Sequence, residues 1–188
     1  MKVPSRADCF KILKELEVPQ NIVDHSIIVN RVAVFLADKL ESSGVRVNKK
    51  AVDRASLLHD MAKYESILHG GRHGDMAFEI LRRKGYPGLG LLVKKHAISS
   101  IQDEKLKLRT WEEKVVYYSD KRAMRHKVVN LSERVAYLKK KCGANKRHLK
   151  KIEDAVPLMK KIEKEIFDKI RMKPQDLLKL NKKLKVRK

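Results

Sequence analysis

Apolar residues recur every three or four positions along most of the chain, and this spacing restricts the fold more than any other feature of the sequence. It puts apolar side chains on one face of an α-helix, whereas a half-buried strand would show strict alternation. The clearest stripe consists of Ile22, Val29, Val32, Ala33 and Leu36. No segment shows the alternation of a strand, so the sequence predicts an all-α fold, a helical bundle.

Capping residues and helix breakers divide this pattern into separate helices. Ser5 with Asp8 and Thr110 with Glu113 have the spacing of capping boxes, and Asn48 is a further N-cap. The predicted helices contain residues 9–16, 22–36, 51–59, 76–81, 91–96, 115–120 and 131–141. Residues 68–74, which contain three glycines, are predicted to form a loop.

Basic residues are concentrated toward the end of the chain. The 188 residues include 45 Lys and Arg against 23 acids, a formal net charge of +22, which favours polyanionic partners. We therefore predict a helical domain in residues 1–142 and a basic helical extension in residues 143–188. Gly143 would end one helix and Asn145 would cap the next. Pro157 and Pro174 are expected to kink or break the extension, giving one or two helices.

Composition excludes other classes of protein. The hydrophobic content of 43% argues against a disordered chain, and no apolar run reaches the length that a membrane-spanning helix needs. Cys9 and Cys142 lie far apart and match no metal or redox spacing. Because no signal-peptide pattern is present, we expect a cytoplasmic protein without a membrane partner. The scarcity of Asn and Gln beside so many charges is a balance seen in thermophile proteins.

Ionisable residues interrupt the apolar faces of several predicted helices. His25 lies on the first long stripe, the pair His59-Asp60 ends another, and Asp120 lies on the helix that follows Thr110. Such groups are costly on an apolar face unless they are paired, hydrogen-bonded or bound to metal. Taken alone, His25 is as readily explained as a hydrogen-bonded core histidine, and a lone His-Asp dipeptide is weak evidence.

Taken in order, these residues resemble the signature of HD-domain metal-dependent phosphohydrolases, which are all-helical. The resemblance covers residues 20–140 and extends to flanking residues, as in Leu-Leu-His-Asp-Met-Ala-Lys around His59. It implies His25, His59, Asp60 and Asp120 as metal ligands. The sequence departs from the family at Met61-Ala62, where members often have Ile-Gly, and at Ala97-Ile98, where archaeal-type members often have glycines.

The resemblance also implies roles for other histidines. His73 and His96 occupy positions that either bind a second metal or contact substrate phosphate, with His69 a lower-ranked replacement for His73. If two ions are bound, Asp60 would bridge them. His126 and His148 lie outside the signature and are predicted at the surface.

Cationic residues near the implied ligands are candidates for phosphate binding. Lys63 would act with Asp60 in catalysis and bind substrate, and Arg31 and Arg122 are further substrate-binding candidates. Each has a plainer alternative: an exposed helix lysine for Lys63 and a surface ion pair for Arg31. For Arg122, the plainer alternative is a solvated basic face that it forms with Lys121 and Arg125.

The implied function is hydrolysis of a nucleotide or related phosphate ester, by phosphomonoesterase or phosphodiesterase chemistry. Imidazole and carboxylate ligands suit Fe, Mn, Ni, Co or Zn, and we expect one or two such ions per chain. A divalent ion held in this way keeps positions open for water and a phosphoryl oxygen, and it lowers the pKa of the water.

A function from another class is non-catalytic nucleic-acid binding, in which the basic extension neutralises phosphates on an HD scaffold. Alternatively, the apolar residues of the extension dock onto the domain or onto a second subunit of a homodimer. These residues are Ile152, Val156, Met159, Ile162, Ile166 and Leu177. Trp111, Tyr117 and Tyr118 are predicted to pack in the core rather than to stack on bases.

Overall fold

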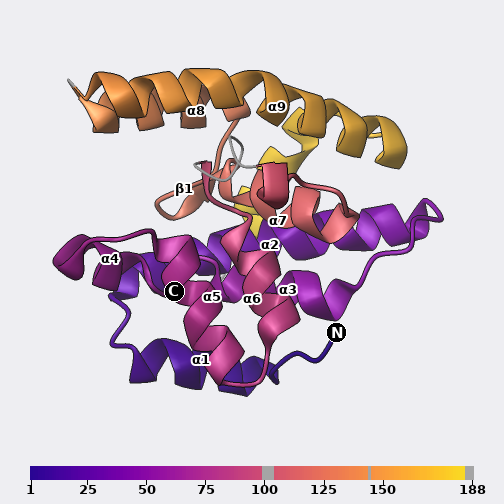
Figure 1. The fold of residues 1–188 in the computed structure, drawn as a ribbon. Helices are drawn as coiled ribbons and strands as arrows, with labels where there is room; N and C mark the ends of the chain where they lie inside the picture. Colours follow the sequence, from indigo (N-terminus) through magenta and orange to yellow (C-terminus); the bar gives the residue numbers. More distant parts are fainter. Residues whose placement is uncertain (99–103, 144, 185–188) are drawn as a thin grey trace.

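The computed structural model describes residues 1–98, 104–143 and 145–184, and α-helices form most of this part (Figure 1). The helices are α1 (Arg6–Glu15), α2 (Gln20–Ser42), α3 (Lys49–Leu58), α4 (Lys63–His69), α5 (His73–Arg83), α6 (Pro87–Lys94), α7 (Trp111–Asp120), α8 (Leu131–Cys142) and α9 (Lys146–Ile170). The 3-10 segments are η2 (Glu104–Leu106) and η3 (Pro174–Leu184), and a hairpin joins β1 (Ala123–Met124) to β2 (Lys127–Val128). The predicted all-α fold is confirmed.

Side-chain caps fix the helix starts where the sequence predicted them. Ser5 and Thr110 both form complete capping boxes, with Asp8 and Glu113 as their partners. The Asn48 side chain accepts a hydrogen bond from the N–H of Ala51, as an N-cap should. These caps satisfy backbone groups that would otherwise lack partners at the helix ends.

The long helix α2 lies at the centre of the bundle and packs against α3, α7 and α9. Its apolar stripe is fully buried at Val29, Val32 and Leu36. The helices α5 and α6 pack together, and α6 contacts α3. This arrangement brings the first part of α2 and the last residues of α3 and α7 toward one region of the molecule (Figure 1).

The C-terminal helix α9 lies beside α8 and also contacts α2 and α7 (Figure 1). Its apolar face docks onto the rest of this chain, with Ile152, Met159, Ile162 and Ile166 buried, and Leu177 of η3 is buried as well. The helix continues through Pro157, so the predicted break does not occur there. Burial of the apolar face on both sides of the proline compensates for the hydrogen bond that proline cannot donate.

Three elements were absent from the sequence prediction, one of which is the short 3-10 segment η2. The segment Lys63–His69 forms the exposed helix α4, and residues 123–128 form the hairpin. Each strand of the hairpin has two residues, which is too short for alternation to be detected. None of the helices in the described ranges is long and apolar enough to cross a membrane.

Candidate metal centre

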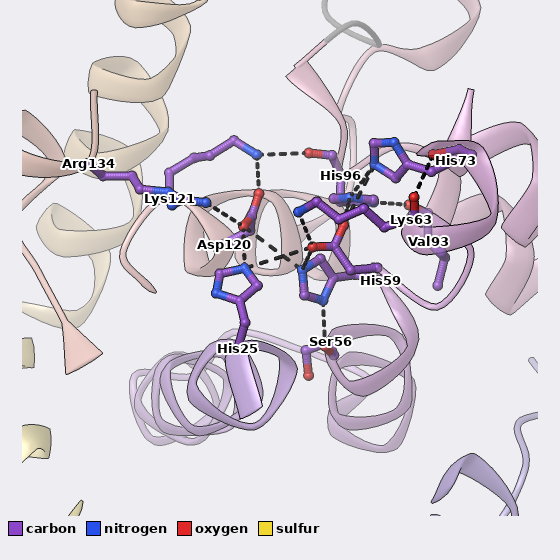
Figure 2. Close-up of polar contacts among 12 residues, drawn as sticks. His25, Ser56, His59, Lys63, His73, Val93, His96, Asp120, Lys121 and Arg134 are labelled. Carbon is purple, nitrogen blue, oxygen red and sulfur yellow. Dashed lines mark hydrogen bonds and ion pairs between the residues drawn. The ribbon is translucent and has the colours of Figure 1, made fainter. Parts of the chain in front are cut away.

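Four buried side chains from three parts of the bundle meet at one point, and Figure 2 labels three of them, His25, His59 and Asp120. His25 comes from α2, and Asp120 is the last residue of α7. The helix α3 ends at Leu58, so His59 and Asp60 lie in the turn that follows. The N–H of Met61 donates to the carbonyl oxygen of Leu58 in this turn, and the ends of the two side chains approach to 3.4 Å, between His59 Nε2 and Asp60 Oδ2.

The first group of donors consists of His25, His59 and Asp120. Each offers one ligand atom, and these atoms lie within 4.8 Å of one another. His25 Nε2 is 3.1 Å from Asp120 Oδ1, and His59 Nε2 is 3.9 Å from the same oxygen. One divalent ion can therefore be shared by two imidazoles and a carboxylate, a donor set that transition metals accept.

A second group shares His59 with the first and adds Asp60 and His96. Asp60 Oδ2 is 3.4 Å from His59 Nε2, and Asp60 Oδ1 is 3.5 Å from His96 Nε2. His73 extends this group, because its Nε2 lies 3.2 Å from His96 Nε2 and 3.7 Å from Asp60 Oδ1. The two oxygens of Asp60 thus face different donors, as a carboxylate that bridges two ions would.

Backbone hydrogen bonds orient two of the imidazoles. His59 Nδ1 donates to the carbonyl oxygen of Ser56 over 2.8 Å, and His96 Nδ1 donates to that of Val93 over 2.6 Å. With the proton on Nδ1, the lone pair of each Nε2 points into the cluster. His59 Nε2 is buried and makes no hydrogen bond to any described residue. An electron pair buried among carboxylate oxygens fits a bound cation, so these residues suit a metal.

The carboxylates of the cluster are ionised. Burial would raise the pKa of Asp60, but its interactions with His59 and Lys63 lower it well below its usual range. Burial would also raise the pKa of Asp120, but Lys121, His25 and Arg134 together lower it well below its usual range. Both groups are therefore in the charged form that metal binding requires.

The two histidines on the other side of Asp60 are neutral. Burial, followed by the neighbouring His96, lowers the pKa of His73 to about 4. The pKa of His96 is also lowered, chiefly by burial. Neutral imidazole is the metal-binding form, so neither group has to lose a proton near neutral pH.

The cationic candidates lie in different places. Lys63 Nζ is 2.6 Å from Asp60 Oδ2, at the edge of the cluster. Arg31 is half-buried on α2, and its buried Nη1 makes no hydrogen bond to a described residue. It does not line the cavity that opens beside the cluster, which is described below. Arg122 points elsewhere and donates to the carbonyl oxygens of Val129 and Pro174.

The basic residues after Asp120 do not form a solvated face. Lys121 is 2% exposed and donates to the carbonyl oxygen of His96, and Arg122 is completely buried. Their charges are accommodated because carbonyl and carboxylate oxygens surround them. Arg125 alone of the three is exposed, at the turn of the hairpin.

The remaining histidines and aromatic residues follow the prediction. His69 is exposed and pairs with Glu65, and His126 and His148 are exposed. Tyr117 and Tyr118 are fully buried in the core. Trp111 packs against the same core from a half-buried position.

A cavity of about 580 Å³ opens beside the cluster. Its lining combines ligand candidates, cations and apolar side chains, namely Asn21, Ile22, His25, Asp60, Lys63, Ile67, Arg125, His126, Arg134, Tyr137, Leu138 and Lys141. Arg134 and Tyr137 were not among the residues singled out from the sequence. The spacing of Leu131, Arg134 and Leu138 on the predicted helix would have placed Arg134 on an apolar face, and that was the one signal that could have found it.

The family model of the HD domain matches residues 22–125, more than half of the chain. The chain belongs to the HD domain family. No curated protein and no solved structure gives a significant match. The matched segment contains His25, His59, Asp60 and Asp120, and its family suggests a metal-dependent phosphohydrolase. It ends before α8, so Arg134 and Tyr137 of this HD-domain protein lie outside it.

Proposed function

We propose that this HD-domain protein is a metal-dependent phosphohydrolase that acts on a nucleotide or a related phosphate ester. The observation that carries the proposal is the pair of donor groups that share His59, with Asp60 between them and a cavity beside them. A purely structural cluster would have no reason to leave the buried Nε2 of His59 without a hydrogen bond.

We assign His25, His59 and Asp120 to a first ion, and Asp60, His96 and His73 to a second ion where one is bound. When bound, such ions supply Lewis acidity toward a phosphoryl oxygen and lower the pKa of water. Imidazole and carboxylate donors are compatible with Fe, Mn, Ni, Co or Zn. The Nδ1 hydrogen bonds of His59 and His96 hold their rings in the ligating orientation before any ion arrives.

Lys63 is our candidate for the cation that stabilises charge on the transferred phosphoryl group. It lines the cavity and contacts Asp60. Burial lowers the pKa of its ammonium group, but Asp60 and Asp120 outweigh that effect and raise it, so the group stays charged. A fixed positive charge in a partly enclosed site stabilises developing negative charge more strongly than it would in water.

The test combines metal analysis with a screen for phosphate release. Elemental analysis of freshly purified protein should find one or two transition-metal ions per chain. Nucleotides, cyclic nucleotides and dinucleotides should then be assayed with each of the five metals added. His59→Ala should remove both metal and turnover, whereas His69→Ala, which alters an exposed histidine, should remove neither. Full turnover by chelator-treated, metal-free protein would contradict the proposal.

Nucleic-acid binding by the basic C-terminal residues is the second candidate function. It is favoured by α9, whose apolar face is buried while Lys146, Arg147 and Lys160 stay exposed. Deletion of residues 143–188 would be a poor test because it would expose the core. Changing these three residues to Gln should instead weaken RNA and DNA binding and reduce its salt dependence. Unchanged affinity and salt dependence would rule out this role for α9.

A further inference from the structure

The cavity beside the metal centre is closed on one side by α8, which lies beyond the segment matched by the HD family model. Arg134, Tyr137, Leu138 and Lys141 all line it. Tyr137, Leu138 and Lys141 follow Arg134 by three, four and seven positions, so all four residues share one face of the helix. One continuous face of α8 therefore forms a wall of the site.

Arg134 is buried without enough partners for its charge. It is 8% exposed, and its buried Nε makes no hydrogen bond to a described residue. Its contact with a carboxylate is a long one, from Nη2 to Asp120 Oδ1 over 3.4 Å (Figure 2). A guanidinium group has five N–H donors in a fork that matches carboxylate or phosphate oxygens. Donors of this group therefore remain for an anion in the cavity.

Asp120 does not need Arg134 as a counter-ion. Its Oδ2 accepts a hydrogen bond from Lys121 Nζ, and its Oδ1 lies 3.1 Å from His25 Nε2. Lys121 also donates to the carbonyl oxygen of His96 over 3.1 Å, which fixes the ammonium group against the cluster. Because this carboxylate already has partners on both oxygens, its long contact with Arg134 explains only part of why a charged group is buried there.

The lining changes in character from the buried floor to the rim. The floor carries His25, Asp60 and Arg134, all buried. The half-buried middle is apolar and consists of Ile22, Tyr137 and Leu138, and the exposed rim includes Ile67, Arg125, His126 and Lys141. This order, from a charged floor to an apolar middle, matches a ligand with an anionic group at one end and a flat, weakly polar group next to it.

Tyr137 supplies the flat surface. The guanidinium of Arg134 lies 5.6 Å from the centre of its ring, a cation–π contact that fixes both side chains relative to one another. Aromatic rings stack on planar groups such as nucleobases. The phosphate-binding group and the stacking surface are therefore three residues apart on one helix.

We propose that Arg134 and Tyr137 form a substrate subsite, in which Arg134 binds a nonbridging oxygen of the substrate phosphate and Tyr137 packs against a planar ring of the ester. This inference rests on the proposed phosphohydrolase function. Its ligand is a phosphate ester whose organic group carries a planar ring, either a free nucleotide or the phosphorylated end of a nucleic-acid strand. The helix that follows the HD segment would then decide which esters the centre accepts.

The experiment measures equilibrium binding to the metal-loaded protein, so it does not depend on turnover. The probes are methylphosphonate, the phosphonate analogue of AMP in which a methylene group replaces the ester oxygen, and a pentanucleotide ending in that analogue. The variants are Arg134→Gln, Arg134→Lys, Tyr137→Leu and Tyr137→Phe. Lys139→Gln is the matched control, because it removes a charge from the same helix at a residue that pairs with Glu153 and does not line this cavity.

We expect Arg134→Gln to weaken binding of all three probes by about tenfold or more, the effect of losing a charged hydrogen bond. Arg134→Lys should recover part of this loss. Tyr137→Leu should weaken the two ring-containing probes and leave methylphosphonate unchanged, and Tyr137→Phe should retain wild-type affinity. Tighter binding of the pentanucleotide than of the AMP analogue would identify the end of a nucleic-acid strand as the ligand of the subsite. Equal or weaker binding of the pentanucleotide would identify a free nucleotide as that ligand.

The same variants separate this subsite from a structural role. If Arg134→Gln loses bound metal, or if no variant changes the affinity for any probe, the subsite is overturned. Tyr137 is half-buried, so its substitution keeps the test decisive even if Arg134→Gln fails to fold. If the wild-type protein binds the probes as expected but hydrolyses no ester with any metal, the proposed function fails and the subsite stands.

Discussion

Asp60 presents its two carboxylate oxygens to different histidines, Oδ2 to His59 at 3.4 Å and Oδ1 to His96 at 3.5 Å. The two halves of the cluster are therefore not equivalent. The half with His25 is built around Asp120, while the half with His96 depends on Asp60. Substitutions that affect one half only should have graded effects on metal content.

Replacement of His96 should remove one ion and leave the other. His96→Ala keeps His25, His59 and Asp120 intact, so we expect metal content to fall to about one ion per chain in a protein that binds two. Asp60→Ala removes a donor from the position between the halves and should reduce the content further. Elemental analysis of both variants, compared with His69→Ala, checks this prediction. Loss of all metal from His96→Ala would contradict it.

Lys63→Met should reduce turnover without removing metal. Its ammonium group contacts Asp60 but is not a ligand, and under the proposed function its charge would act on the phosphoryl group. Loss of such a group commonly costs roughly 100-fold in kcat. The measurement is kcat and metal content side by side, with Lys63→Arg as the charge-preserving control. A wild-type kcat in Lys63→Met would show that the lysine is an ordinary helix lysine.

Arg122→Met should destabilise the fold. The guanidinium is fully buried and bonds to the carbonyl oxygens of Val129 and Pro174, the hydroxyl of Tyr118 and the carboxylate of Glu163. Removing one member of such a buried network costs about 3 to 5 kcal/mol. Urea denaturation should detect this loss of unfolding free energy. Arg82→Ala, which breaks an exposed ion pair with Glu79, should change it by less than about 1 kcal/mol.

Cys9 should resist alkylation while the protein is folded. It is fully buried, and burial raises the pKa of its thiol to about 11 from an ordinary value of 9.0. Because the folded state favours the neutral thiol, this contribution to stability is present below pH 9 and is lost as the pH rises through about 11. Mass spectrometry after iodoacetamide treatment at pH 8 should find Cys142 modified and Cys9 intact. Modification of Cys9 at the rate seen in urea would show that the site is open.

The residues that sequence reasoning identified share one property. His25, His59-Asp60 and Asp120 are ionisable groups on otherwise apolar helices, a conflict that marks a position as unusual from the amino-acid pattern alone. The structure brings these four residues together with His73, His96 and Lys63. Their convergence could not be calculated from helical spacing, because it depends on how α2, α3 and α7 pack against one another.

Arg134 and Arg122 show why the rest was not predictable. Arg134 lies in a helix that continues into Lys139, Lys140 and Lys141, so its charge looks like part of a basic surface. The sequence favours a substrate-binding or solvated Arg122, but the burial of this residue depends on a carbonyl group at Pro174. Contacts between residues so distant in the chain leave no local periodic signal.

The hydrogen bond from Arg122 to Pro174 joins the far end of the chain to a residue just two positions after Asp120. The segment that begins at Pro174 thereby contacts the turn after Asp120, although none of its described residues belongs to the candidate ligand groups. A chain clipped before Pro174 would keep all the candidate ligands but lose this hydrogen bond two residues after Asp120. If Asp120 holds an ion as proposed, loss of the segment that begins at Pro174 should therefore lower the metal content of the protein.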